Sequence, residues 1–127
     1  MARILVVDDD EQLRHMLDIF LSRESHEVIT AENGLVASVR QQEHEADIVI
    51  MDILMPEKEG FETIMEFRRE YPNTKIIAIS GGGRLGPAHY LKLAKIMGAD
   101  FVFEKPVPLV KLREAILVLF NPHRVNI

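Results

Sequence analysis

The sequence contains no cysteine, so the chain can form neither a disulfide framework nor a cysteine-ligated zinc site. It also lacks any apolar run approaching the roughly 20 residues that a membrane span requires. The first apolar run, residues 3–7, is too short and too quickly followed by acids to be a signal peptide. These absences predict a cytoplasmic protein that does not enter a membrane.

Positive charge is also in short supply. Fifteen lysines and arginines stand against twenty aspartates and glutamates, which gives a net charge of −5. Such a surface repels phosphate backbones, so we expect no nucleic-acid binding by this chain. The 127 residues, 47% of them hydrophobic, fit one domain with a sizeable core and contain no low-complexity stretch.

What the chain does contain is an alternation of short apolar runs with longer amphipathic segments. This pattern is typical of a parallel sheet wrapped by helices. The runs span residues 4–7, 27–30, 48–51, 76–79 and 101–103. The first, third and fourth runs are apolar throughout, as strands covered on both faces must be, and the other two are mixed or short. The sequence therefore predicts a doubly wound α/β fold of five parallel strands in the order 2-1-3-4-5, with five helices.

Local signals mark where the helices begin and end. Asp10 and Asn33 are suitable N-caps for the first two, the second running to about residue 44, and the third is expected to begin near Gly60. The fourth lies between Pro87, in its first turn, and Gly98, past its end. The side chains expected on the inner faces of the first three helices are Leu13, Met16, Leu17, Phe20, Leu21, Val36, Val39, Phe61, Ile64 and Met65.

The fifth helix is expected over residues 108–120, ended by Asn121 and Pro122. Its residues 115–120 are all apolar, and at about 100° per residue six consecutive positions encircle a helix. Some of these side chains must therefore face outward. They are either tolerated surface residues or a docking or self-association face.

Polar side chains follow the predicted strands at their carboxyl ends, where open parallel sheets bind ligands. Asp8 and Asp9 follow the first strand and Asp52 follows the third. Ser80 follows the fourth strand, and Lys105 comes just past the fifth. In the predicted strand order these residues converge on one rim of the sheet, with the point of strand-order reversal between the first and third strands.

The carboxylates cannot all lie close together as bare anions. Two of them about 4 Å apart repel by about 4 kcal/mol at an effective dielectric of 20. Either one stays protonated or a cation sits among them, and an all-oxygen site suits Mg²⁺. Taken alone, an acidic triplet after a strand is often only a helix cap with solvated surface, and Asp10 has that role here.

Gly81, Gly83 and Gly86 also spell G-x-G-x-x-G, the dinucleotide-binding fingerprint. That fingerprint belongs to the first strand–helix turn of a nucleotide-binding fold, whereas this one follows the fourth strand. A nucleotide site is therefore not expected.

Several segments together resemble the receiver (phosphoacceptor) domain of two-component response regulators, of the single-domain type found in chemotaxis. They are Val6-Val7-Asp8-Asp9-Asp10, Asp52-Ile53-Leu54-Met55-Pro56, Gly60, Ser80, Gly98-Ala99-Asp100 and Lys105-Pro106. The resemblance covers residues 2–121 and implies a flavodoxin-like receiver fold. We expect a receiver domain over residues 1–121 and a short tail over 122–127.

The resemblance implies that Asp52 is the phosphoacceptor. It also implies that Asp8 and Asp9 hold Mg²⁺ together with Asp52 and the main-chain carbonyl of Leu54. Leu54 is bulky, and we expect it to hinder water and lengthen the phosphorylated lifetime.

Ser80 and Lys105 correspond in the resemblance to the hydroxyl and the ammonium that contact the phosphoryl group. The domain would take that group from a sensor histidine kinase, a phosphotransfer protein or a small phosphodonor. Phosphorylation would then switch the loop and helix after the fourth strand for partner binding through the fourth helix, fifth strand and fifth helix. A homodimer is a further expectation. Val102 stands where the family usually has an aromatic residue, which places the aromatic part of the switch in doubt.

Two alternatives remain open. One is a scaffold of the same fold that acts without phosphorylation. The other is a Mg²⁺-dependent aspartyl phosphatase, against which stands the lack of a second Asp two residues after Asp52. We expect no enzyme activity beyond self-catalysed phosphoryl transfer and autodephosphorylation.

Overall fold

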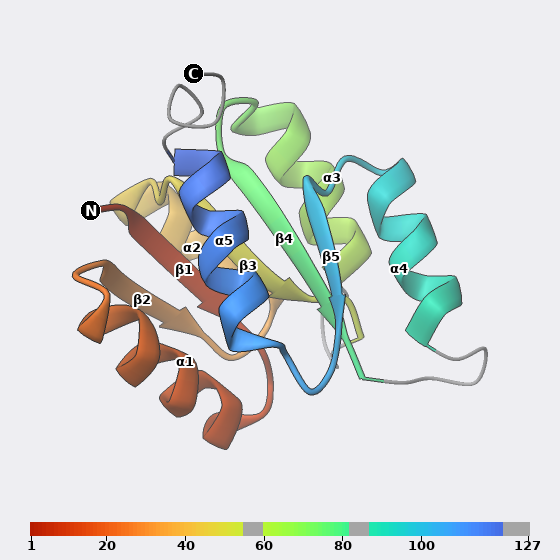
Figure 1. The fold of residues 1–127 in the computed structure, drawn as a ribbon. Helices are drawn as coiled ribbons and strands as arrows, with labels where there is room; N and C mark the ends of the chain where they lie inside the picture. The colour runs from red at the N-terminus through yellow and green to blue at the C-terminus, as the bar shows by residue number, and fades with distance from the viewer. Residues whose placement is uncertain (55–59, 82–86, 121–127) are drawn as a thin grey trace.

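The computed structural model describes residues 1–54, 60–81 and 87–120. Five parallel strands form one sheet in the order β2-β1-β3-β4-β5, as predicted (Figure 1). The strands are β1 (Arg3–Val7), β2 (Glu27–Ala31), β3 (Ile48–Asp52), β4 (Lys75–Ser80) and β5 (Phe101–Glu104). The three strands predicted to be central are central, and the mixed β2 and the short β5 form the edges.

Helices cover both faces of the sheet, which makes a three-layer α/β domain. They are α1 (Glu11–Arg23), α2 (Gly34–His44), α3 (Gly60–Glu70), α4 (Pro87–Ile96) and α5 (Leu109–Phe120). α1 and α5 lie on one face, and α2, α3 and α4 lie on the other (Figure 1). Right-handed crossovers between parallel strands produce this division.

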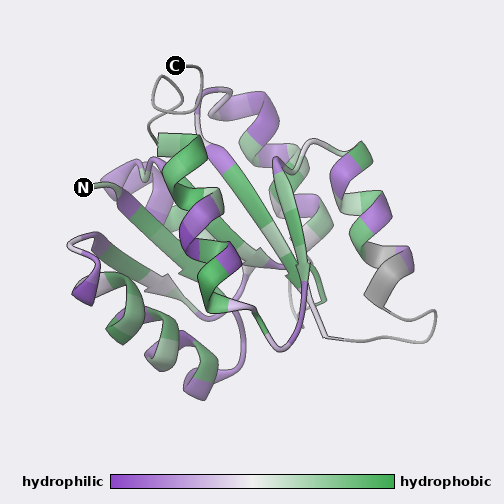
Figure 2. Cartoon of the chain, viewed as in Figure 1, coloured by the Kyte–Doolittle hydropathy of each residue, from purple (hydrophilic) through white to green (hydrophobic). Residues whose placement is uncertain are grey.

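The core consists of two apolar layers, one on each side of the sheet. Both faces of β1, β3 and β4 are covered, so these strands are hydrophobic along most of their length (Figure 2). Leu17 and Ile116 fill the layer under α1 and α5, and Ile64 and Phe67 fill the layer under α3. None of the helices in the described part of the chain is long and apolar enough to cross a membrane.

The predicted helix ends are confirmed where the structure describes them. The Asp10 carboxylate accepts from the main-chain N–H groups of Gln12 and Leu13, and the Asn33 side chain accepts from that of Val36. Gly98, just past α4, has φ +118°, a conformation that side chains with a Cβ rarely adopt. The predicted helix stop at Asn121-Pro122 lies outside the described residues, as do the tail over 122–127, Met55-Pro56 and residues 82–86.

Three side chains predicted to face inward do not. Met16, Val39 and Met65 are 40%, 52% and 47% exposed. The inner positions are taken by neighbouring residues, which on α1 and α3 are the fully buried Leu17 and Ile64. On α2 these neighbours are Ala37 and the polar Gln41.

Gln41 was not predicted to be buried. Its amide donates to Thr74 Oγ1 at 3.1 Å and its carbonyl accepts from the Ala46 N–H at 2.9 Å. These bonds satisfy a polar side chain that is only 1% exposed, as burial requires. On α5 the expected mixture is present, with Ile116 buried while Leu117 and Val118 are exposed.

Candidate functional site

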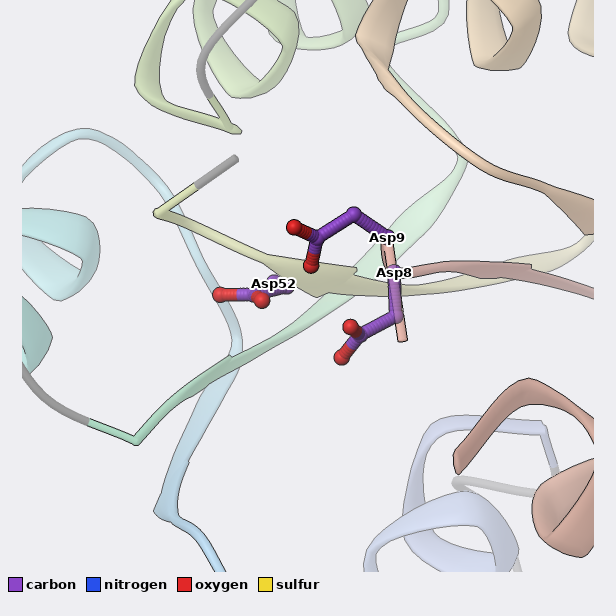
Figure 3. A group of neighbouring side chains, drawn as sticks. All are labelled: Asp8, Asp9 and Asp52. Carbon is purple, nitrogen blue, oxygen red and sulfur yellow. The ribbon is translucent and has the colours of Figure 1, made fainter. Parts of the chain in front are cut away.

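Three carboxylates meet at the carboxyl ends of two neighbouring strands. β1 and β3 are paired in register up to Val7 and Met51, so Asp8 and Asp52, the next residues, lie side by side. Ligand oxygens of Asp8, Asp9 and Asp52 all lie within 4.8 Å of one another (Figure 3). The sequence prediction that these acids converge on one rim is therefore met, and Asp10 instead caps α1.

Asp8 is completely buried, and each of its polar groups has a neighbour. Its N–H donates to the Ala31 carbonyl at 3.1 Å, which extends the β1–β2 ladder by one bond. Its Oδ1 accepts from the Asp10 N–H at 2.9 Å. Its Oδ2 lies 2.9 Å from Lys105 Nζ, an ion-pair contact that lacks hydrogen-bond geometry. Asp8 Oδ2 accepts no hydrogen bond from the described residues, so it keeps lone pairs that can bind a metal ion.

Asp52 is also buried, at 3% exposure. Its Oδ1 accepts from the Leu54 N–H at 2.9 Å, and its Oδ2 accepts from Lys105 Nζ at 3.1 Å. The main-chain N–H of Lys105 donates to the main-chain carbonyl of Ser80 at 3.0 Å, which holds the lysine beside the end of β4. The ammonium therefore reaches both buried carboxylates, which confirms that Lys105 lies at the predicted rim.

Burial and crowding shift the proton affinities of this cluster. Burial raises the pKa of Asp52 from 3.8 to about 6, with the nearby Asp8 adding to the rise and the Leu54 N–H and Lys105 opposing it. Burial likewise raises the pKa of Asp8, against the Asp10 N–H and Lys105. For Lys105, burial alone would lower the pKa, but the two carboxylates outweigh it and the pKa is raised. When both buried acids are ionised, Lys105 offsets only one of their two negative charges.

Ser80 is fully buried at the end of β4, one residue beyond Ile79, which pairs with Asp52 across the sheet. Within the described part of the chain, no group makes a hydrogen bond to its hydroxyl oxygen. A buried hydroxyl without a partner costs free energy. Such a group is suited to a ligand that arrives later at the same rim.

Two glycines make room for the site. A Cβ on Gly60 would lie 2.4 Å from both the Asp52 carbonyl oxygen and Ile53 Cα, so only glycine lets the start of α3 approach the end of β3 this closely. A Cβ on Gly81 would lie 2.9 Å from Lys105 Cδ. Gly60 was predicted as the start of the third helix and as part of the receiver resemblance, and the structure adds the steric reason for a glycine at this position.

Arg14 was not predicted to belong to the site. This arginine lies on α1 and its Nη1 donates to the main-chain carbonyl of Asp8 at 2.7 Å. The signal in the sequence was its place one helical turn after the capping Asp10, but nothing in the pattern indicated what the guanidinium contacts.

Val102 lies on the α4 side of the sheet, packed against the layer that contains Leu91. Its neighbours Phe101 and Phe103 lie on the α5 side, where their rings stack with centroids 6.4 Å apart. Neither phenylalanine can therefore replace an aromatic residue on the α4 side of β5.

The residues present fit a magnesium ion. The donors are carboxylate oxygens, which Mg²⁺ prefers. Ligands on opposite sides of an ion with bonds of about 2.1 Å are about 4 Å apart, close to the 4.8 Å span of this cluster. An additional cation would also favour the ionised form of Asp52, whose pKa is raised by burial and, to a smaller extent, by the nearby Asp8.

Comparisons with known proteins agree with this geometry. The family model described as "Response regulator receiver domain" matches residues 4–117. The chemotaxis protein CheY of Thermotoga maritima is 36% identical over 115 residues, which cover 90% of this chain and 93% of that protein. CheY of Bacillus subtilis is 34% identical over 120 residues, or 94% of this chain and 98% of that protein.

Solved structures give the same result. A response regulator receiver domain protein from Clostridium thermocellum superposes with a TM-score of 0.87 at 28% identity and covers 100% of both chains. The response regulator TrrA from Thermotoga maritima, solved in complex with Mg(2+)-BeF, superposes with a TM-score of 0.83 at 35% identity. That match covers 94% of this chain and 99% of TrrA.

Proposed function

Because this chain belongs to the receiver-domain family of two-component response regulators and is CheY-like, we propose that it accepts a phosphoryl group on Asp52. The donor is a phosphohistidine of a sensor histidine kinase or phosphotransfer protein, or a small acyl phosphate. The protein acts in this proposal as a cytoplasmic phosphorelay switch, with residues 1–121 as the receiver domain and 122–127 as a tail.

The observation that carries the proposal is the place of Asp52 in the sheet. β3 lies between β1, which ends in the two other carboxylates, and β4, which ends in Ser80. Asp52 therefore has acids on one side and the Ser80 hydroxyl and Lys105 ammonium on the other. Asp52 therefore lies between the residues proposed to bind the metal ion and the residues proposed to contact the phosphoryl group.

The residues have distinct roles in the transfer. An Asp52 oxygen forms a bond to phosphorus while the bond from phosphorus to the donor nitrogen or oxygen breaks. A phosphohistidine nitrogen takes a proton from water as it leaves, whereas an acyl phosphate leaves as a carboxylate anion. Lys105, which contacts both Asp8 and Asp52, is placed to pair with the incoming anionic oxygens. Its positive charge offsets the repulsion between the carboxylates and the phosphoryl group.

Asp8, Asp9, Asp52 and the main-chain carbonyl of Leu54 would hold Mg²⁺. When bound, this ion supplies charge neutralisation and orientation of the phosphoryl oxygens. Asp8 Oδ2, which accepts no hydrogen bond from the described residues, and the solvent-facing position of Asp9 support this assignment. The similar protein TrrA was solved in complex with Mg(2+)-BeF.

Ser80 is the residue through which phosphorylation reaches the rest of the domain. The added group brings up to about two negative charges and three acceptor oxygens. The Ser80 hydroxyl, which lacks a partner among the described groups, can donate to one of them. We propose that this bond shifts the segment after β4 and changes the face formed by α4, β5 and α5, where a partner or a second copy binds. Val102 makes that shift independent of an aromatic side chain on the α4 side of β5.

Incubation of the protein with Mg²⁺ and acetyl phosphate, read by intact mass, tests the proposal. Wild type is expected to gain one phosphoryl mass, and neither Asp52→Asn nor wild type in EDTA is expected to gain it. Phosphorylation of Asp52→Asn to the wild-type extent would assign the wrong acceptor. If wild type remains unmodified while partner affinity is the same for Asp52→Asn, the phosphorylation-independent scaffold is the better description, and turnover of an aryl phosphate would favour the phosphatase.

A further inference from the structure

Arg14 donates from Nη1 to the main-chain carbonyl of Asp8 at 2.7 Å, from a partly buried position on α1. We propose that Arg14 is a positioning residue that holds Asp8 and Asp9 in the orientation required to bind Mg²⁺. The inference rests on the proposed function, because it assigns Arg14 a part in the metal site proposed there.

The carbonyl to which Arg14 donates lies directly after the end of β1, between the two aspartates of the metal site. β1 ends at Val7, and the Asp8 N–H makes a last sheet-type bond to the Ala31 carbonyl. The Asp8 carbonyl belongs to the planar peptide that joins Asp8 to Asp9. A hydrogen bond to this oxygen fixes the plane of that peptide, and with it the direction in which both aspartates leave the main chain.

Three linked hydrogen bonds close the turn from β1 into α1. The Asp8 carboxylate accepts from the Asp10 N–H at 2.9 Å, and the Asp10 carboxylate accepts from the Gln12 N–H at 2.9 Å. The Arg14 N–H donates to the Asp10 carbonyl at 3.0 Å, so the guanidinium is anchored one turn into a capped helix. From this position the Arg14 side chain reaches the main-chain carbonyl of Asp8. Arg14 thus connects the rigid helix to the strand end that carries the metal ligands.

A charge effect and a positioning effect of Arg14 predict opposite results. If Arg14 acted only as a nearby positive charge, its removal would strengthen the binding of a cation. If it positions the ligands, its removal weakens binding, because residues that orient metal ligands typically contribute tenfold or more to metal affinity. The sign of the change therefore separates the two roles without reference to phosphorylation.

Arg40 offers a matched control on α2. It lines the same shallow hollow as Arg14, together with Thr30 and Glu32. Its guanidinium pairs with the exposed Glu43 at 3.6 Å instead of with a residue of the carboxylate cluster. Arg40→Ala removes the same charge from the same region and leaves the Asp8 carbonyl bond in place.

The test is calorimetric titration of the metal-free protein with MgCl₂. Wild type is expected to bind one Mg²⁺, Arg14→Ala about tenfold more weakly, and Arg40→Ala with unchanged or higher affinity. Arg14→Lys keeps the charge and one donor and is expected to recover part of the loss. Arg14→Ala with wild-type or tighter affinity, beside a wild type that binds Mg²⁺, would overturn the inference and leave the proposed function intact.

A measurement without metal completes the test. In EDTA, amide hydrogen exchange by NMR is expected to be at least several-fold faster at Asp10 in Arg14→Ala than in wild type, with Ile50 in the central strand unchanged. Unchanged exchange at Asp10 would contradict the inference even if Mg²⁺ binding weakened. If Arg14→Ala does not fold, Arg14→Lys is used for both measurements. A wild type that binds no Mg²⁺ would overturn the proposed function and this inference together.

Discussion

Asp52→Asn is expected to stabilise the metal-free protein at neutral pH. In the folded state Asp52 is buried beside Asp8, and only one ammonium, that of Lys105, is shared between the two carboxylates. Burial raises the pKa of Asp52 from 3.8 to about 6, so the charged form is less favourable in the folded state than in the unfolded chain. An asparagine has nearly the same shape and carries no charge. It also keeps an oxygen for the Leu54 N–H, which now bonds to Asp52 Oδ1.

The size of the effect follows from the two pKa values. The difference between 3.8 and about 6 corresponds, at about 1.4 kcal/mol per pH unit, to about 3 kcal/mol at pH 7. The Asp52 side chain is only 5% exposed, so solvent screens little of this. The pKa of about 6 already includes the attraction between Asp52 and Lys105, so we expect a gain of up to about 3 kcal/mol in the free energy of unfolding.

The pH dependence has a definite sign. A carboxyl group whose pKa is higher in the folded state binds protons more tightly there, so its contribution to stability is fully present below pH 3.8 and is lost as pH rises through about 6. The difference in stability between Asp52→Asn and wild type is therefore expected to be small near pH 4, to grow between pH 4 and 6, and to level off above pH 7.

Urea denaturation in EDTA, followed by circular dichroism at several pH values, measures this difference. Glu114→Gln is the control, because it removes one negative charge from an exposed position on α5. Its stability is expected to stay within about 0.5 kcal/mol of wild type at every pH. Saturating Mg²⁺ is expected to stabilise wild type more than Asp52→Asn, because only wild type keeps all three carboxylates. If Asp52→Asn is no more stable than wild type at pH 7, the cost assigned to the buried charge is wrong.

Three further predictions concern the same rim. Gly60→Ala is expected to lower the free energy of unfolding by about 3 kcal/mol, since the added Cβ meets main-chain atoms of β3 at 2.4 Å, and an unchanged urea midpoint would contradict the close approach. Ser80→Ala is expected to leave stability within about 1 kcal/mol of wild type because its hydroxyl makes no bond within the described residues, while partner affinity no longer responds to acetyl phosphate. Leu54→Asn is expected to shorten the phosphorylated lifetime, measured as loss of the phosphoryl mass after the donor is removed, and an equal or longer lifetime would show that Leu54 does not exclude water.

The strand order could be predicted because a strand that is buried on both faces has a continuous apolar sequence. The runs that became β1, β3 and β4 are apolar throughout, because helices cover both faces of these three strands. Inner and outer helix positions were harder to predict. Val39 is as apolar as a core residue, but Ala37 lies under α2 and leaves Val39 on the open side of the helix.

The site residues could be placed together because a parallel sheet gathers its strand ends. Once β1, β3 and β4 are neighbours, the residues that follow them must share a rim, whatever their side chains do. Hydrogen bonds from side chains to the main chain produce no comparable sequence pattern, so they could not be predicted. The bond from Arg14 to the Asp8 carbonyl depends on the rotamer of one long side chain. The contact of Gly60 with β3 depends on how closely the start of α3 approaches the end of that strand.

The unfavourable electrostatics of the cluster are connected with its proposed use. In the metal-free fold two buried acids share one ammonium and a buried hydroxyl makes no bond with the described groups. Each of these unsatisfied groups matches something that the proposed reaction brings, a cation for the acids and phosphoryl oxygens for Ser80 and Lys105. Free energy lost before these groups bind is then recovered on metal binding and phosphorylation, and this recovery is available to the switch proposed above. A variant that satisfies these groups in advance, such as Asp52→Asn, gains stability and loses the difference in free energy on which switching depends.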